Sequence, residues 1–310
     1  LYDSLRNKIM PLSDDLIVYP NHGAGSACGK NMSKETTDTL GHQKEVNYAL
    51  NPALNKEEFI KAILTGLTPP PGYFPKNVLM NIQGYESLDT VLERGHKALT
   101  AENFEMVANE TNALVLDTRN ATDFANGFIP NSINIGLDGS FAQWVGEMIP
   151  DIKQEILLVS NPGYEDEAMI RLSRVGYDGS IGYLEGGFDA WKKAGKEVDT
   201  VKRITAEQFA TIHENEKPLT IDIRKKSEFQ SQHITDAVNI PLNEINNHLA
   251  EFPKDKPFIL HCAGGYRSMI AASMLKQRGW DNFSDVIGGF TEIAKTNVPK
   301  SEYICPSTML

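Results

Sequence analysis

The feature that most constrains the fold of this chain is an internal repeat. Three segments recur at an offset of 105 residues: 99–104 (LTAENF) and 204–209 (ITAEQF), 116–119 (LDTR) and 221–224 (IDIR), 133–135 (INI) and 238–240 (VNI). A fourth pair, 186–188 and 288–290 (both GGF), recurs at an offset of 102. Solenoid repeats have periods of roughly 20 to 50 residues, so this longer period predicts two duplicated domains.

Each copy alternates short apolar runs with helical stretches. The runs at 113–116 (ALVL) and 156–159 (ILLV) are apolar throughout, which is typical of parallel strands that are buried on both faces. The sequence therefore predicts the α/β fold class, with two tandem domains at residues 85–198 and 199–310. In each domain, helices flank a parallel sheet. Residues 1–84 form a separate unit before them.

One loop of the second copy has the pattern of a nucleophilic site. The segment 261–268 (HCAGGYRS) follows the apolar run 257–260 and precedes a helical stretch at 269–277. Backbone N–H groups and the positive end of a helix converge on such a loop, which favours a thiolate at Cys262. Arg267 adds a permanent cation. The pattern predicts a nucleophile whose product is held by backbone amides; the alternative is an inert, buried cysteine beside a glycine turn.

This loop resembles the active-site loop of rhodaneses, sulfurtransferases that carry a sulfane sulfur as a cysteine persulfide. Four residues separate Cys262 from Arg267, as in the sulfur-carrying members of that fold, whereas the related cysteine phosphatases and arsenate reductases have five. The resemblance implies that Cys262 and Arg267 are catalytic. It implies a substrate-binding loop made of Ala263, Gly264, Gly265, Tyr266 and Ser268. It also implies a thiosulfate or persulfide donor, a thiophilic acceptor and no cofactor for this domain.

A second rhodanese pattern, Asp-x-Arg followed by Glu-Phe and His-Ile, lies earlier in the same copy. It is matched by Asp222, Arg224, Glu228, Phe229, His233 and Ile234. We expect these residues to form scaffold, because a buried Asp–Arg pair is more often structural than catalytic. His233 is expected to be a capping or core histidine.

The first copy has no cysteine at the matching place. If a tyrosine common to both loops is aligned, Ser160 lies opposite Cys262; if a later glycine is aligned, Val159 does. Neither side chain carries a persulfide, and Glu165 and Asp166 would repel an anionic donor. The first copy is therefore predicted to be an inactive rhodanese-like domain that orients its neighbours.

Residues 1–84 contain helical stretches around 36–50 and 56–67, a short apolar run at 15–20 that predicts a buried strand, and a proline-rich segment at 68–75 that predicts extended backbone. The loop after residue 20 contains His22. A phosphate-binding P-loop is excluded there, because Ala24 occupies the first glycine position and Asn31 follows the lysine. A structural histidine and a metal ligand at the end of a strand both remain open.

Residues 1–5, 18–30 and 69–75 resemble the C-terminal part of metallo-β-lactamase-fold proteins, in particular the glyoxalase II and persulfide dioxygenase branch. The resemblance implies that His22 is a candidate for the second metal position, or lies near a single iron without binding it. The family's His-x-His-x-Asp-His signature is absent from the 310 residues. We therefore expect iron or zinc only in a longer parent protein, and we expect residues upstream of Leu1.

Composition limits the compartment and the partners. The formal net charge of -11 argues against binding nucleic acid through its phosphates. No apolar run approaches the ~20 residues of a membrane helix. The three cysteines, Cys28, Cys262 and Cys305, are too few for a disulfide framework, which favours a cytoplasmic protein; Cys28 and Cys305 are expected to be structural. A homo-oligomer is compatible with the sequence.

The order of the three units resembles bacterial fusion proteins that join a persulfide dioxygenase to two rhodanese domains in sulfide detoxification. The expected function is that of a sulfurtransferase. Sulfane sulfur would move from thiosulfate or a low-molecular-weight persulfide, through a Cys262 persulfide, to a thiophilic acceptor. The alternative, from another functional class, is a non-catalytic interaction module built from duplicated domains.

Overall fold

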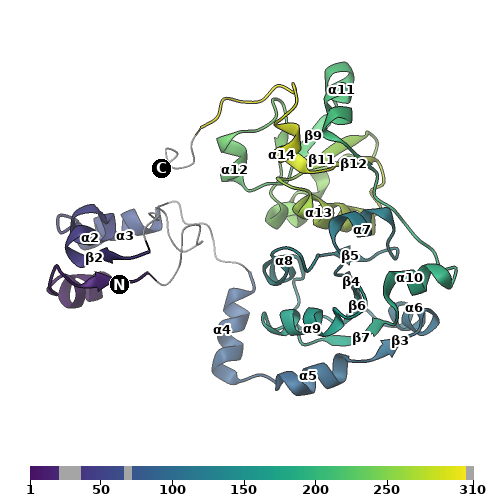
Figure 1. The fold of residues 1–310 in the computed structure, drawn as a ribbon, viewed down its shortest axis with the longest axis horizontal. Coiled ribbons are helices and arrows are strands. Elements are labelled where there is room, and N and C mark those ends of the chain that lie inside the picture. The colour runs from purple at the N-terminus through teal and green to yellow at the C-terminus, as the bar shows by residue number, and fades with distance from the viewer. Residues whose placement is uncertain (21–35, 66–71, 305–310) are drawn as a thin grey trace. The chain divides into compact units, whose positions relative to one another are not determined.

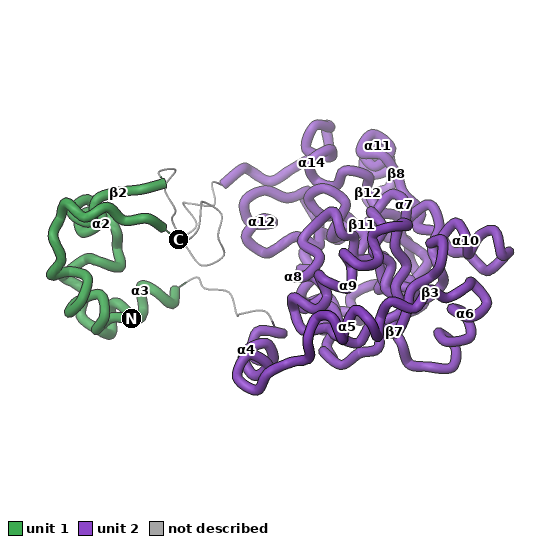
Figure 2. The backbone as a smooth tube through the Cα atoms, turned by 60° about the horizontal axis from the view of Figure 1, so that its bottom comes forward, with its two compact units in different colours: residues 1–69, 307–310 green, residues 70–306 purple. Residues whose placement is uncertain are grey.

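The computed structural model describes residues 1–20, 36–65 and 72–304. The chain divides into two compact units, one of residues 1–69 with 307–310 and one of residues 70–306 (Figure 2). His22, Cys28 and Cys305 lie outside the described residues. Both repeats belong to the second unit.

The first unit is small and mostly helical. It contains α1 (Tyr2–Ser4) with a π-helical turn (Leu5–Ile9), β1 (Ile17–Val18), β2 (Asp38–Thr39), α2 (Leu40–Val46), a 3-10 turn (Tyr48–Leu50) and α3 (Lys56–Leu64). Asn55 caps α3 in a capping box with Glu58. The predicted burial of the strand is wrong: Ile17 is 60% and Val18 37% exposed, and in the described part of the chain the partner of β1 is the two-residue β2.

The second unit begins with α4 (Phe74–Gln83) and α5 (Leu88–Gly95). Pro75 lies in the first turn of α4, where its missing N–H leaves no hydrogen bond unmade, so the last two residues of the predicted extended segment 68–75 are helical, while 68–71 lie outside the described residues. Lys76 donates a hydrogen bond to the carbonyl of Pro150. Helix α4, which the sequence analysis grouped with residues 1–84, is thus part of the unit that contains the repeats.

The two repeats have the same sheet, which confirms both the α/β fold class and the duplication. The first sheet has the order β3 (Ala98–Leu99), β7 (Ser180–Leu184), β6 (Ile156–Val159), β4 (Leu114–Asp117), β5 (Ile133–Asn134). The second has the order β8 (Arg203–Ile204), β12 (Phe283–Val286), β11 (Phe258–His261), β9 (Leu219–Asp222), β10 (Val238–Asn239). All neighbouring strands within these two sheets are parallel.

Helices cover both faces of each sheet (Figure 1). The first repeat has α6 (Ala101–Glu110), α7 (Ala121–Asn126), α8 (Phe141–Met148), α9 (Glu165–Ser173) and α10 (Gly187–Lys193). The second has α11 (Ala206–Glu216), α12 (Lys226–Ser231), α13 (Tyr266–Gln277), α14 (Gly289–Ile293) and 3-10 turns at Leu242–Asn247 and Leu249–Glu251. Alternate strand residues face opposite cores: Leu116 and Leu158 face one, Val115 and Leu157 the other.

Helix α13 lies between the two repeats (Figure 1). All its residues from 268 to 275 are buried, so it lacks the polar face of a surface helix. One of its sides packs on its own sheet. On the other side, the backbone N–H of Asn134 in β5 donates to Ser273 Oγ at 2.9 Å, and Gln277 donates to the Asn131 carbonyl at 3.1 Å. One continuous apolar core therefore spans both repeats.

Candidate active site

Cys262 is the first residue after β11, and α13 begins four residues later, so the predicted strand, loop and helix are present. The side chain is 1% exposed. The backbone N–H of Gly265 donates a hydrogen bond to Cys262 Sγ at 3.1 Å. Gly265 has φ +100°, a conformation that glycine adopts at little cost. The sulfur thus lies at the positive end of a twelve-residue helix with an amide directed at it.

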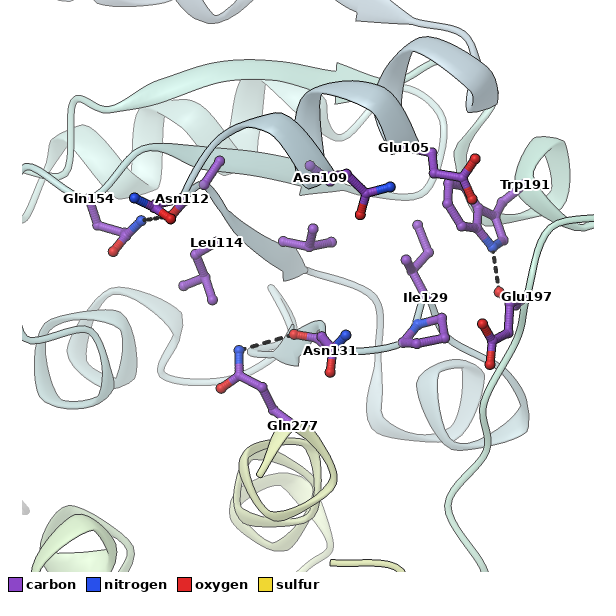
Figure 3. A pocket seen from close by; sticks show the side chains of 14 residues that line it. Glu105, Asn109, Asn112, Leu114, Ile129, Asn131, Gln154, Trp191, Glu197 and Gln277 are labelled. Carbon is purple, nitrogen blue, oxygen red and sulfur yellow. Dashed lines mark hydrogen bonds between the residues drawn. The ribbon is translucent and has the colours of Figure 1, made fainter. Parts of the chain in front are cut away.

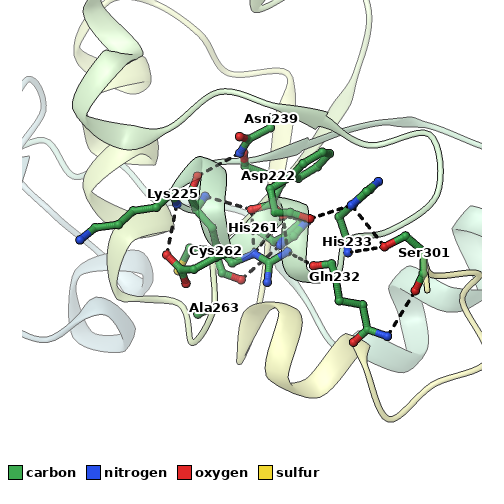
Figure 4. Close-up of polar contacts among 12 residues, drawn as sticks. Asp222, Lys225, Gln232, His233, Asn239, His261, Cys262, Ala263 and Ser301 are labelled. Carbon is green, nitrogen blue, oxygen red and sulfur yellow. Dashed lines mark hydrogen bonds and ion pairs between the residues drawn. The ribbon is translucent and has the colours of Figure 1, made fainter. Parts of the chain in front are cut away.

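The other predicted loop residues surround this sulfur in different ways. Ala263 is half-buried and Gly264 exposed, whereas Gly265 and Ser268 are buried. Ser268 Oγ donates to the Gly265 carbonyl at 3.2 Å, which ties the loop to the first turn of α13. A Cβ on Gly264 would meet no described atom within 4 Å. Residues 263 and 264 thus place little side-chain bulk next to Cys262, which Figure 4 shows beside Ala263.

Arg267 is anchored by a carboxylate from α12. Its two terminal nitrogens donate to Glu228 Oε2 at 2.6 Å and Oε1 at 2.8 Å. Burial favours a raised pKa for Glu228, but the hydrogen bonds and charge of Arg267 outweigh it and lower that pKa. Burial likewise opposes the charge of Arg267, but the hydrogen bonds that Arg267 donates to Glu228, and the charge of Glu228, hold the pKa of Arg267 above its ordinary value. The guanidinium is thus a fixed cation beside the loop, held in a bidentate pair.

The predicted Asp–Arg pair lies next to the loop, because Asp222 pairs with His261 across neighbouring strands (Figure 4). Arg224 donates through Nε to Asp222 Oδ2 at 2.9 Å and through a terminal nitrogen to the Gln232 carbonyl at 2.8 Å. Its guanidinium lies 3.9 Å from the ring centroid of Phe290. These contacts join the end of β9 to α12 and α14, which is the predicted scaffold role.

Two histidines near this pair are structural. Burial lowers the pKa of His261, against the nearby charge of Asp222, so His261 is neutral. His233 lies with Nδ1 2.7 Å from the Phe229 carbonyl and stacks on the Phe229 ring with centroids 3.9 Å apart. Its partner is a carbonyl in the last turn of α12 and its side chain is partly buried, so of the predicted capping and core roles it fits the capping one.

Sequence reasoning missed a second ion pair at the loop. Arg203 in β8 donates through Nε to Asp285 Oδ2 in β12 at 3.0 Å; Asp285 is fully buried and the Arg203 side chain is 12% exposed. The Arg203 guanidinium lies 3.5 Å from the place of a Cβ on Gly265. The sequence offered one sign of this pair: Asp285 is a charged residue in the strand Phe283–Val286, all of whose residues are buried. Arg203 is therefore a further cation next to the sulfur-bearing loop.

Asp285 gives the protein a predicted pH dependence of stability. Burial raises its pKa to about 6, although Ser268 and Arg203 act in the lowering direction. An unfolded aspartate has a pKa of about 3.9, so between these values the folded state binds more protons. Stability should then fall as pH rises through this window and level off above it, by on the order of 3 kcal/mol from this residue.

Urea unfolding of wild type and Asp285→Asn between pH 4 and 7.5 measures this contribution. We expect the free energy of unfolding of the wild type to fall, relative to the variant, between about pH 4 and 6. Parallel curves for the two proteins would contradict the assignment.

The register of the strands decides the alignment of the two loops. His261 pairs with Asp222, and Val159 pairs with Asp117, so Ser160 is the counterpart of Cys262. Ser160 Oγ lies 2.8 Å from Thr118 Oγ1. Val159 is thereby excluded as the matching residue.

The amide that contacts sulfur in the second repeat has another partner in the first. Gly163, at φ +90°, is the counterpart of Gly265, and its N–H donates to Glu165 Oε2 at 2.8 Å. Glu165 itself takes the place of Arg267. The N–H of the first loop thus donates to a carboxylate of the same loop, whereas the matching N–H of the second loop donates to the thiol of Cys262. This difference agrees with the predicted inactivity of the first copy.

A cavity elsewhere in the repeats has a different character. Its volume is about 510 Å³, and amide side chains of Asn109, Asn112, Asn131, Gln154 and Gln277 line it together with Trp191 (Figure 3). None of the predicted site residues contributes to it. The hydrogen bonds from Gln277 to the Asn131 carbonyl and from Trp191 Nε1 to the Glu197 carbonyl show that several of its polar groups are already paired.

The described residues do not fit a metal site. Among residues 1–20, 36–65 and 72–304, no group of three or more His, Cys, Asp or Glu side chains could hold a metal ion. The candidate ligand His22 lies outside these ranges. Within the same ranges, no helix has the length and apolar character to cross a membrane.

Comparison with known proteins gives one family. The model described as Rhodanese-like domain matches residues 100–194 and 205–296. A thiosulfate sulfurtransferase GlpE of Pseudomonas syringae pv. syringae (strain B728a) is 34% identical over 99 residues, which are 32% of this chain and 92% of that protein. A sulfurtransferase of Allochromatium vinosum is 30% identical over 100 residues, 32% of this chain and 94% of its own.

One solved structure shares a longer stretch. The crystal structure of a metallo-beta-lactamase from Staphylococcus aureus subsp. aureus COL is 30% identical, covers 59% of this chain and has a TM-score of 0.46. The match spans 49% of that protein, about half its length.

Proposed function

This chain belongs to the rhodanese-like domain family, and from that membership we propose that its second repeat is a sulfurtransferase with Cys262 as the sulfur carrier. The observation that carries the proposal is the contact between Cys262 Sγ and the Gly265 N–H at 3.1 Å. An amide directed at a sulfur at a helix N-terminus stabilises negative charge there. The relatives named as sulfurtransferases are similar to this chain over 99 and 100 residues, about the length of one repeat.

In the proposed reaction, the Cys262 thiolate attacks the outer sulfur of thiosulfate or of a low-molecular-weight persulfide. The new S–S bond forms at Cys262, the bond to the sulfonate or thiol group breaks, and sulfite or a thiolate leaves with the electron pair. An acceptor thiolate, sulfite or cyanide then attacks the outer sulfur of the Cys262 persulfide, and the Cys262 thiolate is the leaving group. No external oxidant or reductant enters either step.

The loop residues have distinct parts in this reaction. The Gly265 amide and the end of α13 stabilise the charge on the carried sulfur. Arg267, held by Glu228, supplies a fixed positive charge. Ala263 and Gly264 place little side-chain bulk beside the sulfur. Ser268 ties the loop to the first turn of α13 through its hydrogen bond to the Gly265 carbonyl.

Intact mass after incubation with thiosulfate tests the proposal on wild type and Cys262→Ser. We expect a gain of one sulfur atom in the wild type, lost on adding cyanide or a thiol and absent from the variant. No gain with either thiosulfate or glutathione persulfide would overturn the sulfur carrier. A non-catalytic interaction module would then be the better account of the duplicated domains.

We also propose that this transfer serves persulfide oxidation in a longer protein that joins a persulfide dioxygenase to two rhodanese domains. The support is the resemblance of residues 1–5, 18–30 and 69–75 to the end of that dioxygenase domain. Because the described residues fit no metal site, iron enters no step above. Iron content and oxygen uptake with glutathione persulfide, measured on the longer protein, test the proposal; a protein without either would contradict it.

A further inference from the structure

Tyr266, predicted to belong to the substrate-binding loop, points into the first repeat. Its hydroxyl donates to the carbonyl of Gly136 at 2.7 Å. Burial, together with the charge of Asp138, raises the pKa of this phenol, so it stays a neutral donor. The fourth residue after Cys262 is thus fixed by a segment 130 residues earlier in the chain.

The segment that receives the ring is a glycine turn after β5. A Cβ on Gly139 would lie 2.4 Å from two atoms of the Tyr266 ring, and a Cβ on Gly136 would lie 3.4 Å from it. Gly139 has no left-handed φ, and the three atoms nearest to its Cβ position all belong to the Tyr266 ring. The turn is therefore shaped to hold this aromatic side chain.

Tyr266 is the first residue of α13, directly after Gly265. The N–H that reaches Cys262 Sγ belongs to Gly265, so fixing Tyr266 restrains this amide through the residue directly before it. The same helix is bound to the first repeat further along, at Ser273 and Gln277. Arg203, beside Gly265, donates to Thr122 Oγ1 of α7 at 3.2 Å. The first repeat thus contacts helix α13 through three described hydrogen bonds and Arg203 of β8 through a fourth.

We propose that the inactive repeat positions the sulfur-carrying loop, and that Tyr266 is the positioning residue through which it acts. The proposal rests on the sulfur transfer proposed above and gives the first repeat a part in it. Tyr266 does not bind the donor: its ring lies in the Gly136–Gly139 turn. The position of the Gly265 N–H relative to Cys262 Sγ is thereby set by the first repeat, which does not contain the cysteine.

The first repeat supplies a matched control. Tyr164 occupies the place of Tyr266 in the first loop, but it is 52% exposed. Replacing it removes the same side chain from the same loop position, without a glycine turn to receive it. Tyr164→Ala should therefore leave both the loop of Cys262 and its reactivity unchanged.

The test compares Gly139→Ala, Tyr266→Ala and Tyr266→Phe with Tyr164→Ala. It measures the rate of sulfur loading from thiosulfate, the pH profile of Cys262 alkylation by iodoacetamide, and Tm. A displaced amide should slow loading about 10- to 100-fold in Gly139→Ala and Tyr266→Ala and move the alkylation profile to higher pH. Loss of the hydroxyl alone in Tyr266→Phe should cost about two- to tenfold.

A double variant separates positioning from general damage. Once the Tyr266 ring is gone, a Cβ on Gly139 no longer displaces it. Adding Gly139→Ala to Tyr266→Ala should therefore cause no further loss of loading rate. Three results would each overturn the proposal. The first is an additive loss in the double variant, and the second is a wild-type loading rate and alkylation profile in Gly139→Ala. The third is an effect of Tyr164→Ala equal to that of Tyr266→Ala. If Gly139→Ala does not fold, wild-type behaviour of Tyr266→Phe and Tyr266→Ala decides against it.

The two proposals fail separately. A wild type that takes up no sulfur overturns the sulfurtransferase, while the alkylation profiles still test the positioning. A wild type that loads sulfur, with variants that behave identically, overturns the positioning alone.

Discussion

Gly289→Ala is expected to abolish sulfur loading by displacing the backbone of Cys262. A Cβ at this position would lie 2.4 Å from the Cys262 carbonyl oxygen and 2.9 Å from the carbonyl carbon of Ala263. Both are backbone atoms, already fixed by hydrogen bonds from the N–H groups of Phe290 and Thr291. Gly289 also has φ +54°, which costs another residue about 1–3 kcal/mol.

The expected size of the effect is a loss of loading of about 100-fold or more, measured by intact mass against time with thiosulfate. The equivalent change in the first repeat, Gly187→Ala, is the control. Gly187 has φ +63°, and its Cβ would lie 2.7 Å from the Ser160 carbonyl oxygen. It should lower Tm to a similar degree and leave loading close to wild type. Equal loss of loading in both variants would show that general destabilisation is the cause.

Asp222→Ala is expected to give the largest loss of stability among the single variants considered. It leaves the buried guanidinium of Arg224 with the Gln232 carbonyl and the Phe290 ring but without its counter-charge. Breaking a buried ion pair by removing one partner costs about 3–5 kcal/mol. Urea unfolding at pH 7 measures this cost directly.

Asp189→Ala is the matched comparison for that variant. Asp189 also pairs with a cation, Lys192, but its side chain is 76% exposed, and exposed pairs contribute about 0–1 kcal/mol. The difference between the variants therefore reports burial and not the presence of an ion pair. An Asp222→Ala variant no less stable than Asp189→Ala would contradict the scaffold role.

Much of the fold was predictable because its signals are local. Apolar runs of four residues, such as 156–159, predict buried parallel strands wherever they occur, and the repeat shows that the pattern is used twice. The predicted strand, loop and helix around Cys262 depend on neighbouring residues alone. The capping box at Asn55 and Glu58 is local in the same way.

Predictions that depended on distant partners were less successful. The run at 15–20 has the composition of a buried strand, yet Ile17 and Val18 are exposed, since burial depends on which layers lie above a strand. Arg203 and Asp285 are 82 residues apart, and their pairing follows from the order of β8 and β12 in the sheet. The likeness of residues 1–84 to the metallo-β-lactamase fold remains a prediction.

By itself, the sequence determined the duplication, the α/β class and the placing of a cysteine, two glycines and an arginine between a strand and a helix. Only the tertiary structure decided which way the loop side chains point. Arg267 turns to Glu228, 39 residues away, and Tyr266 turns out of its own repeat towards Gly136. The physical reason is that a loop side chain takes the direction in which it finds a partner, and here those partners lie on elements that only the packing of helices and sheets brings to the loop.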